Sequence, residues 1–133
     1  GIYGPGRNIF ERIKEGSVEK VVKPNQYFNR IHVEDLVGAI CMGLDKPYLA
    51  GTYNIADDLP ASGGDVLDEA TKILGIPFFP KVDFKDANLS VMAKSFYADS
   101  KKVSNQKLVS VLGYSLKYPT YVTGLRSLID KDP

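Results

Sequence analysis

The stretch Y-F-N-R-I-H-V-E-D-L-V-G-A-I-C-M-G-L, residues 27–44, changes its hydrophobic period part-way along. Residues Tyr27 to Val33 are expected to be extended. From Glu34 the apolar residues recur at helical spacing, which predicts a helix from Glu34 to Leu44. A strand that runs directly into a helix is typical of α/β folds.

One face of this helix is expected to be buried, because its apolar residues recur at spacings of three, one, three, one and three. The face consists of Val33, Leu36, Val37, Ile40, Cys41 and Leu44.

The neighbouring segments fit the same pattern. Gly1 to Gly6 (G-I-Y-G-P-G) has turn composition, and Thr52 to Ala56 is expected to be a second strand that ends in Asp57 and Asp58. The short segment Lys20 to Lys23 is also expected to be extended.

Three further helices are predicted from their capping residues. They are Ile9 to Glu15 after Asn8, Asp65 to Leu74 with Ser62 as cap, and a helix that begins at Ser104 and ends at Leu112. Thr120 is expected to cap a last helix, whose apolar face includes Tyr121, Leu125 and Ile129. Residues 76–88 are expected to be irregular, and residues 90–98 suit a helix or a strand.

Strands that alternate with helices predict an α/β fold with parallel strand pairing. Only about two of the expected strands are long enough for a Rossmann-type sheet. Two strands cannot bury the apolar faces of several helices. We therefore expect the sheet to be completed by residues outside this sequence.

The composition is that of an ordinary globular domain. The 133 residues include 44% hydrophobic and 25% charged residues, and the net charge is +1, which argues against a nucleic-acid partner. No apolar run approaches the ~20 residues of a membrane span, so no membrane partner is expected. The single cysteine, Cys41, cannot form an internal disulfide, and a cytoplasmic location is expected.

Several motifs resemble one family in register. Residues 30–36 (R-I-H-V-E-D-L), residues 53–57 (Y-N-I-A-D) and the turn at residues 3–6 (Y-G-P-G) resemble the extended short-chain dehydrogenases/reductases, the NAD-dependent epimerase/dehydratase family. The tail resembles the same family in D-S-K at residues 99–101, L-G-Y at residues 112–114 and P-T at residues 119–120.

This resemblance implies the fold class and the domain content. The expected fold is α/β, the C-terminal portion of a Rossmann-type NAD(P)-binding fold plus its small helical substrate-binding lobe. Residues 1–133 would be the C-terminal, substrate-binding portion, and the N-terminal dinucleotide-binding half of the same protein would be its partner. NAD or NADP is expected in the full-length protein and no cofactor for this chain alone, because the sequence has no Gly-rich phosphate loop.

The function implied is binding of a small hydroxylated or sugar-like substrate in an NAD(P)-dependent oxidoreductase of the epimerase/dehydratase type. The alternative is a non-catalytic relative that senses NAD(P) or acts as a scaffold, because a fold does not fix a function. A free-standing α/β interaction domain is a weaker third possibility. Self-association of the chain is also possible, since it would leave a strand edge bare.

Four residues are candidates for substrate binding: Tyr3, Arg7, Arg30 and His32. Ligands of open α/β sheets lie at the carboxyl ends of the strands, where the Tyr3 turn and Arg7 would be found. Family members that act on nucleotide sugars have an arginine where this sequence has Phe28. Arg30 would therefore bind another anion, or pair with a carboxylate of the following helix.

Each candidate also has a structural interpretation. The turn at residues 1–6 need not contact a ligand, and His32 and Asp35 can serve the start of the helix. Asp57 and Asp58 suit a polar strand exit better than an acid/base pair, and a metal site is not expected around one histidine. Tyr97 and Lys101 have the spacing of the family's catalytic pair but not its position, so no catalytic residue is assigned. Five aromatic residues suit a pocket wall or a satellite core: Phe78, Phe79, Phe84, Phe96 and Tyr97.

Overall fold

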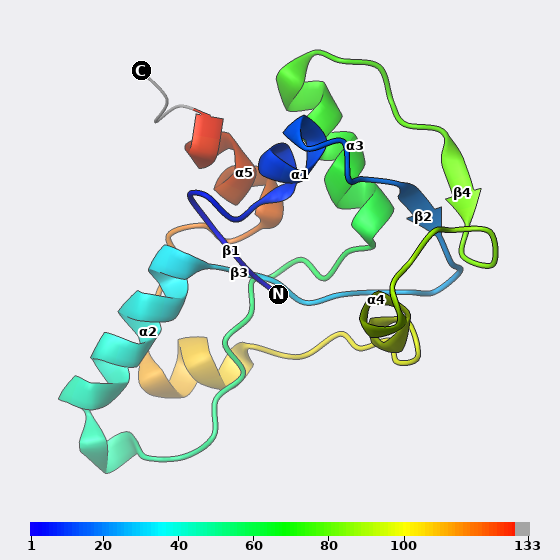
Figure 1. The fold of residues 1–133 in the computed structure, drawn as a ribbon. Coiled ribbons are helices and arrows are strands. Elements are labelled where there is room, and N and C mark those ends of the chain that lie inside the picture. The colour runs from blue at the N-terminus through cyan, green and yellow to red at the C-terminus, as the bar shows by residue number, and fades with distance from the viewer. Residues whose placement is uncertain (130–133) are drawn as a thin grey trace. The chain divides into compact units, whose positions relative to one another are not determined.

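The computed structural model describes residues 1–129, and the chain divides into two compact units (Figure 1). Unit 1 combines Gly1–Pro5, Asn29–Pro60 and the residues from Val103 onward. Unit 2 combines Gly6–Phe28 and Ala61–Lys102. Both units contain parallel strands and helices, which confirms the predicted α/β class.

Unit 1 is organised around two very short parallel strands. In β1 (Ile2–Tyr3) and β3 (Ile31–His32), Ile2 pairs with Ile31 and Tyr3 pairs with His32. Helix α2 (Val33–Asp45) begins directly after β3, as the change of period predicts. The extended segment predicted at residues 27–33 is too long, since within it only Ile31 and His32 form strand pairs with β1.

The strand predicted at Thr52 to Ala56 is wrong, because these residues form no helix or strand. Two of their carbonyl groups are bonded by side chains instead of by a neighbouring strand. The Lys107 Nζ donates to the Thr52 oxygen over 2.9 Å, and the Asn105 Nδ2 donates to the Ala56 oxygen over 2.9 Å. These residues have the alternating pattern of a strand, but no strand in residues 1–129 lies beside them to pair with.

The core of unit 1 lies between α2 and the C-terminal residues. Ala39 of α2 packs with Leu108 and Leu112 of η2, a short π-helical segment (Leu108–Leu112) that lies inside the helix predicted from Ser104. η1 (Pro47–Leu49) follows α2, and α5 (Tyr121–Ile129) is the last helix. Gly113 ends η2 in the left-handed region, with φ +79°.

The predicted buried face of α2 is wrong in large part. Val37 is 53% exposed, Ile40 49% and Leu44 76%, and Cys41 is exposed as well. The side chains buried on α2 are Asp35 and Ala39. The apolar period therefore marks a face that residues 1–129 leave open.

Unit 2 contains three helices and a second parallel strand pair. The helices are α1 (Ile9–Lys14), α3 (Gly63–Leu74) and α4 (Val91–Phe96). Strand β2 (Lys20–Val22) pairs with β4 (Lys81–Asp83), and Val21 is in register with Val82. Strand β4 is not predicted from the sequence, because two charged residues around one valine, in a Pro- and Phe-rich segment, are too short a pattern to indicate a strand.

The helix ends of unit 2 follow the capping residues in the sequence. The Asn8 side chain accepts from the N–H groups of Phe10 and Glu11, and the Ser62 Oγ accepts from the Asp65 N–H. Gly75 ends α3 with φ +67°. Ser90 caps α4, so the segment that suited a helix or a strand is a helix.

Candidate functional site

Tyr3 and His32 meet at the carboxyl ends of β1 and β3. Their strand register places them side by side, and their rings pack edge to face with centroids 5.3 Å apart. The His32 ring also lies 4.2 Å from the Tyr118 ring, centroid to centroid. The structure thus brings together two of the four predicted binding residues and adds an aromatic residue from the C-terminal segment.

His32 holds the start of α2. It is 1% exposed, and its Nδ1 accepts from the Glu34 N–H over 3.1 Å. An accepting Nδ1 requires the neutral tautomer with the proton on Nε2. The geometry therefore gives His32 a structural role, while contact between His32 and a substrate stays a prediction.

Asp35 joins α2 to the loop that leads into α5. Its buried carboxylate accepts from the Tyr114 hydroxyl over 2.8 Å, from the Lys117 N–H over 2.7 Å and from the Tyr118 N–H over 2.9 Å. Burial and the bond to Asp35 raise the pKa of Tyr114 to about 12. The structural interpretation of Asp35 therefore agrees with its contacts.

Asp57 has a buried carboxylate that is only partly hydrogen-bonded. It is 3% exposed, its Oδ1 accepts from the Leu59 N–H over 2.9 Å, and its Oδ2 has no hydrogen-bond partner in the described residues. Burial raises the pKa of Asp57 to about 6, although the Leu59 N–H and the Arg30 charge act in the opposite direction. Asp58, by contrast, is exposed and accepts from the Asn105 Nδ2.

The Tyr3 hydroxyl is buried against α5. A Cβ placed on Gly124 would lie 1.8 Å from the Tyr3 oxygen, so this helix position has no room for a larger residue. Burial, followed by the charge of Asp57, raises the pKa of Tyr3. In residues 1–129 the Tyr3 hydroxyl has no hydrogen-bond partner, which is unusual for a buried tyrosine.

Arg30 precedes β3 and is partly buried. Its carbonyl oxygen accepts from the Asp57 N–H over 2.7 Å. Burial raises the pKa values of both Asp57 and Tyr3, and the positive charge of Arg30 offsets part of that rise. A carboxylate of α2 is one predicted partner of Arg30. The structure adds Asp57 as a second carboxylate that interacts with the charge of Arg30. An interaction of Arg30 with a substrate anion stays a prediction.

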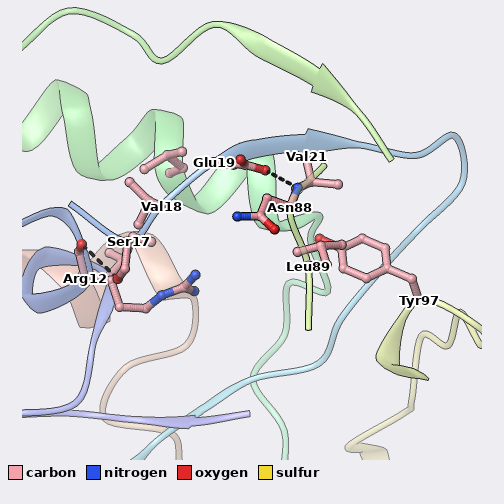
Figure 2. Close-up of a pocket in the computed structure, with 11 residues that line it drawn as sticks. Arg12, Ser17, Val18, Glu19, Val21, Asn88, Leu89 and Tyr97 are labelled. Atoms are coloured by element: carbon pink, nitrogen blue, oxygen red, sulfur yellow. Dashed lines mark hydrogen bonds between the residues drawn. The ribbon is translucent and has the colours of Figure 1, made fainter. Parts of the chain in front are cut away.

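Unit 2 contains its own pocket of about 110 Å³ (Figure 2). Figure 2 shows the side chains of Arg12, Asn88 and Tyr97 around the same space. Ile9, Ser17, Val18, Glu19, Val21, Gly63, Leu67 and Leu89 complete the lining. Arg7, the fourth predicted binding residue, is exposed in unit 2 and does not line this pocket.

Arg12 is not predicted as a pocket residue from the sequence. It lies in an amphipathic helix, where an arginine on the polar face is ordinary. The sequence does indicate a turn at Gly16–Ser17 after α1, but a turn does not show which residues come to lie near Arg12. The Ser17 N–H donates to the Arg12 carbonyl over 3.1 Å. No pattern in the sequence alone marks that neighbourhood as a pocket.

Three aromatic residues of unit 2, Phe28, Phe84 and Tyr97, form a small cluster. The Tyr97 ring lies 5.2 Å from the Phe28 ring and 5.0 Å from the Phe84 ring, while Phe78 and Phe96 are exposed. Tyr97 follows α4 as its C-cap, and Lys101 forms an ion pair with Asp99 over 2.7 Å. This environment differs from that of a Tyr/Lys pair on one long helix.

Within residues 1–129, no group of three or more His, Cys, Asp or Glu side chains is placed to hold a metal ion. No helix in that range has the length and apolarity needed to cross a bilayer.

No family model matches the chain, and no curated protein matches it. Solved structures do match. A conserved protein of unknown function from Silicibacter pomeroyi is 41% identical with a TM-score of 0.90, and the match covers 100% of this chain and 47% of that one. A human epimerase family protein solved with NADPH is 18% identical with a TM-score of 0.81, and the match covers 98% of this chain and 46% of that one.

A third structure, an NAD-dependent epimerase/dehydratase from Methylobacillus flagellatus, is 28% identical with a TM-score of 0.67. The match covers 98% of this chain and 44% of that one. This chain has the epimerase/dehydratase fold. The predicted resemblance to Rossmann-type short-chain dehydrogenases/reductases is thereby confirmed at the level of the fold.

The chain spans about half the length of each of these three proteins. Nicotinamide cofactors occur among them: the human protein was solved with NADPH, and a dTDP-glucose 4,6-dehydratase from Bacillus anthracis was solved with NAD. That dehydratase is 18% identical with a TM-score of 0.69, and the match covers 98% of this chain and 41% of the dehydratase.

Proposed function

We propose that the chain is the substrate-binding part of an NAD(P)-dependent oxidoreductase of the epimerase/dehydratase type. The substrate would be a small hydroxylated or sugar-like molecule. The observation that carries this proposal is the fold match over the whole chain to proteins of this type, at TM-scores of 0.81 and 0.67.

The strand ends of unit 1 support a binding role. Tyr3 and His32 lie at the carboxyl ends of two parallel strands, which is where open α/β sheets bind ligands. Arg30 adds a positive charge directly before β3. We propose that Tyr3, Arg30 and His32 shape the substrate site. Arg7, which belongs to unit 2, stays a separate candidate for substrate binding.

The partner of this part is proposed to be a dinucleotide-binding half that belongs to the same protein. The exposed apolar face of α2 supports this, because Rossmann-type folds bury their helices on a sheet. That half would supply the phosphate-binding loop and the catalytic tyrosine and lysine, and this chain would orient the substrate against the nicotinamide ring.

Cofactor binding with and without a dinucleotide-binding half tests the proposal. The 133-residue chain alone should show no calorimetric binding of NADH or NADPH with a dissociation constant below ~10 μM, about −7 kcal/mol. The chain joined to a Rossmann half from a similar protein should bind one of the two cofactors in the micromolar range.

Tight binding of NADPH to the chain alone would contradict the proposed division of labour. Binding by the joined protein without turnover of any hydroxylated or sugar-like substrate would favour a non-catalytic sensor or scaffold instead.

A further inference from the structure

The pocket of unit 2 contains a positive charge that has no ion-pair partner in residues 1–129. Arg12 projects from α1 into the lining, and its guanidinium forms no ion pair or hydrogen bond with any residue in the range 1–129. Its neighbour on the same helix, Lys14, is engaged with Glu11 at 3.7 Å. Arginine in a pocket is suited to anions, because its planar fork of N–H donors matches a carboxylate.

Glu19 is the one carboxylate in the pocket lining, and it is held elsewhere. Its Oε2 accepts from the Asn88 N–H over 3.0 Å, and it forms no ion pair with Arg12. The lining therefore combines an available cation with an anion at a separate position. This arrangement suits a singly charged ligand, because the one cation of the lining neutralises one negative charge and a second charge would face Glu19 unpaired.

The remaining walls suit a short carbon stem. Val21 and Leu67 are buried, and both line the pocket together with Leu89. Asn88 adds a polar residue to the lining. A volume of about 110 Å³ is below the usual range of pockets that enclose a whole ligand, so it suits one end of a larger molecule.

We propose that this pocket binds a carboxylate group on a short aliphatic stem, with Arg12 as the residue that selects for the charge. The inference goes beyond the proposed function, because the pocket is lined by residues of unit 2 alone. Its ligand class is a small molecule that bears a carboxylate. Arg12 is a specificity residue here and takes no part in hydride transfer.

The probe is sodium butyrate, added to the ¹⁵N-labelled 133-residue chain and followed by amide chemical shifts. Saturable shifts are expected at Ser17, Val18, Gly63 and Leu89, with a dissociation constant of roughly 1 mM. Two controls define the chemistry. 1-Butanol has the stem without the charge, and inorganic phosphate has charge without the stem, so both should bind at least about tenfold more weakly.

Two variants separate a specific site from general attraction. Arg12→Gln should weaken butyrate binding by about 10- to 100-fold, the loss of a charge-assisted hydrogen bond. Lys14→Gln removes the same charge two residues along α1 and should leave the affinity unchanged. Both positions are exposed, so unchanged amide spectra without ligand will show that the fold is retained.

The proposal is overturned if butyrate gives no saturable shifts, if phosphate binds as well as butyrate, or if both variants weaken binding equally. None of these measurements involves a nicotinamide cofactor. A failure of this pocket would therefore leave the cofactor test decisive for the proposed function, and a failure of the cofactor test would leave this pocket measurable.

Discussion

Two aspartates of unit 1 show how similar residues take different roles through their partners. Asp35 is buried with three donors at 2.7 to 2.9 Å, whereas one carboxylate oxygen of the buried Asp57 has no hydrogen-bond partner in residues 1–129. The first carboxylate stabilises the fold through these three bonds. The second is destabilising when charged, because a buried carboxylate without sufficient donors favours the proton.

Replacing Asp35 is expected to destabilise the chain strongly. Asp35→Ala leaves the Tyr114 hydroxyl and two backbone N–H groups without their acceptor, at a cost of about 2–4 kcal/mol in the free energy of unfolding. Urea denaturation measures the change. The matched control is Glu34→Gln, which removes the neighbouring carboxylate and its solvent-exposed ion pair with Lys117, and should cost less than about 1 kcal/mol. Equal losses in the two variants would contradict the role given to Asp35.

Asp57 is expected to make stability depend on pH in the opposite direction from most carboxylates. Its folded pKa of about 6 lies above the ordinary value of 3.8, so the folded state binds the proton more tightly than the unfolded state. The contribution of Asp57 to stability is therefore full below pH ~4, falls as the pH rises to ~6, and is flat above that value. The fall is at most about 3 kcal/mol.

The measurement is the difference in melting temperature between the parent and Asp57→Asn from pH 4 to pH 7.5. The variant should gain on the parent as the pH rises, because it cannot ionise at this position. Asp58→Asn is the control, since Asp58 is exposed and hydrogen-bonded. A difference that does not change with pH would show that Asp57 titrates normally.

At the scale of elements, the sequence predicts the helices well and the strands poorly. Asn8 and Ser62 mark helix starts through a local side-chain bond to the backbone, so short sequence windows are sufficient. Strands need a partner. Residues 52–56 have the right pattern but no neighbouring strand in residues 1–129, whereas residues 81–83 are too short to show a pattern and pair with β2.

The candidate site divides in the same way. The residues of the I-H-V-E-D-L segment are local to one strand–helix junction, so the sequence alone offers a structural interpretation of His32 and Asp35, beside the prediction that His32 binds substrate. The neighbours from distant segments, Tyr118 against His32 and Gly124 against Tyr3, follow from tertiary packing. Arg12 was missed for the same reason, since its pocket is made by five separate segments.

Glycines on helices α5 and α2 give opposite predictions. Gly124→Ala would place a Cβ 1.8 Å from the Tyr3 oxygen and should cost more than about 2 kcal/mol of stability. Adding Tyr3→Phe removes that oxygen and should recover part of the loss in a double-mutant cycle. Gly43→Ala in α2 meets nothing within 4 Å and should stabilise the chain by about 0.5–1 kcal/mol. Additive effects of the Gly124 and Tyr3 changes would exclude the contact.

At the scale of the whole molecule, open apolar surface is the main feature. Val37, Ile40 and Leu44 are exposed on α2, and Ile2 and Val111 are exposed elsewhere in unit 1. Exposed apolar side chains that recur along one helix typically mark an interaction surface. The period of α2 is therefore explained by a covering surface that residues 1–129 do not contain.

The isolated chain is expected to self-associate at ~10 μM, since ordinary domains are only marginally stable and this one leaves apolar surface open. Light scattering and sedimentation measure the mass. Ile40→Gln combined with Leu44→Gln should shift the chain toward monomer, while Val91→Gln, at an exposed position of α4, should not. A monomeric parent with a cooperative melt above ~55 °C would show instead that the chain closes its own core.

The interleaving of the two units has a consequence for synthesis on the ribosome. Unit 2 is complete once Lys102 has emerged, but unit 1 needs segments from both ends of the chain. Its first strand, β1, finds β3 early, whereas Leu108, Leu112 and Leu125 arrive last. Unit 2 can therefore finish folding while α2 still lacks its partners, and the nascent chain passes through a stage in which α2 is open to chaperones.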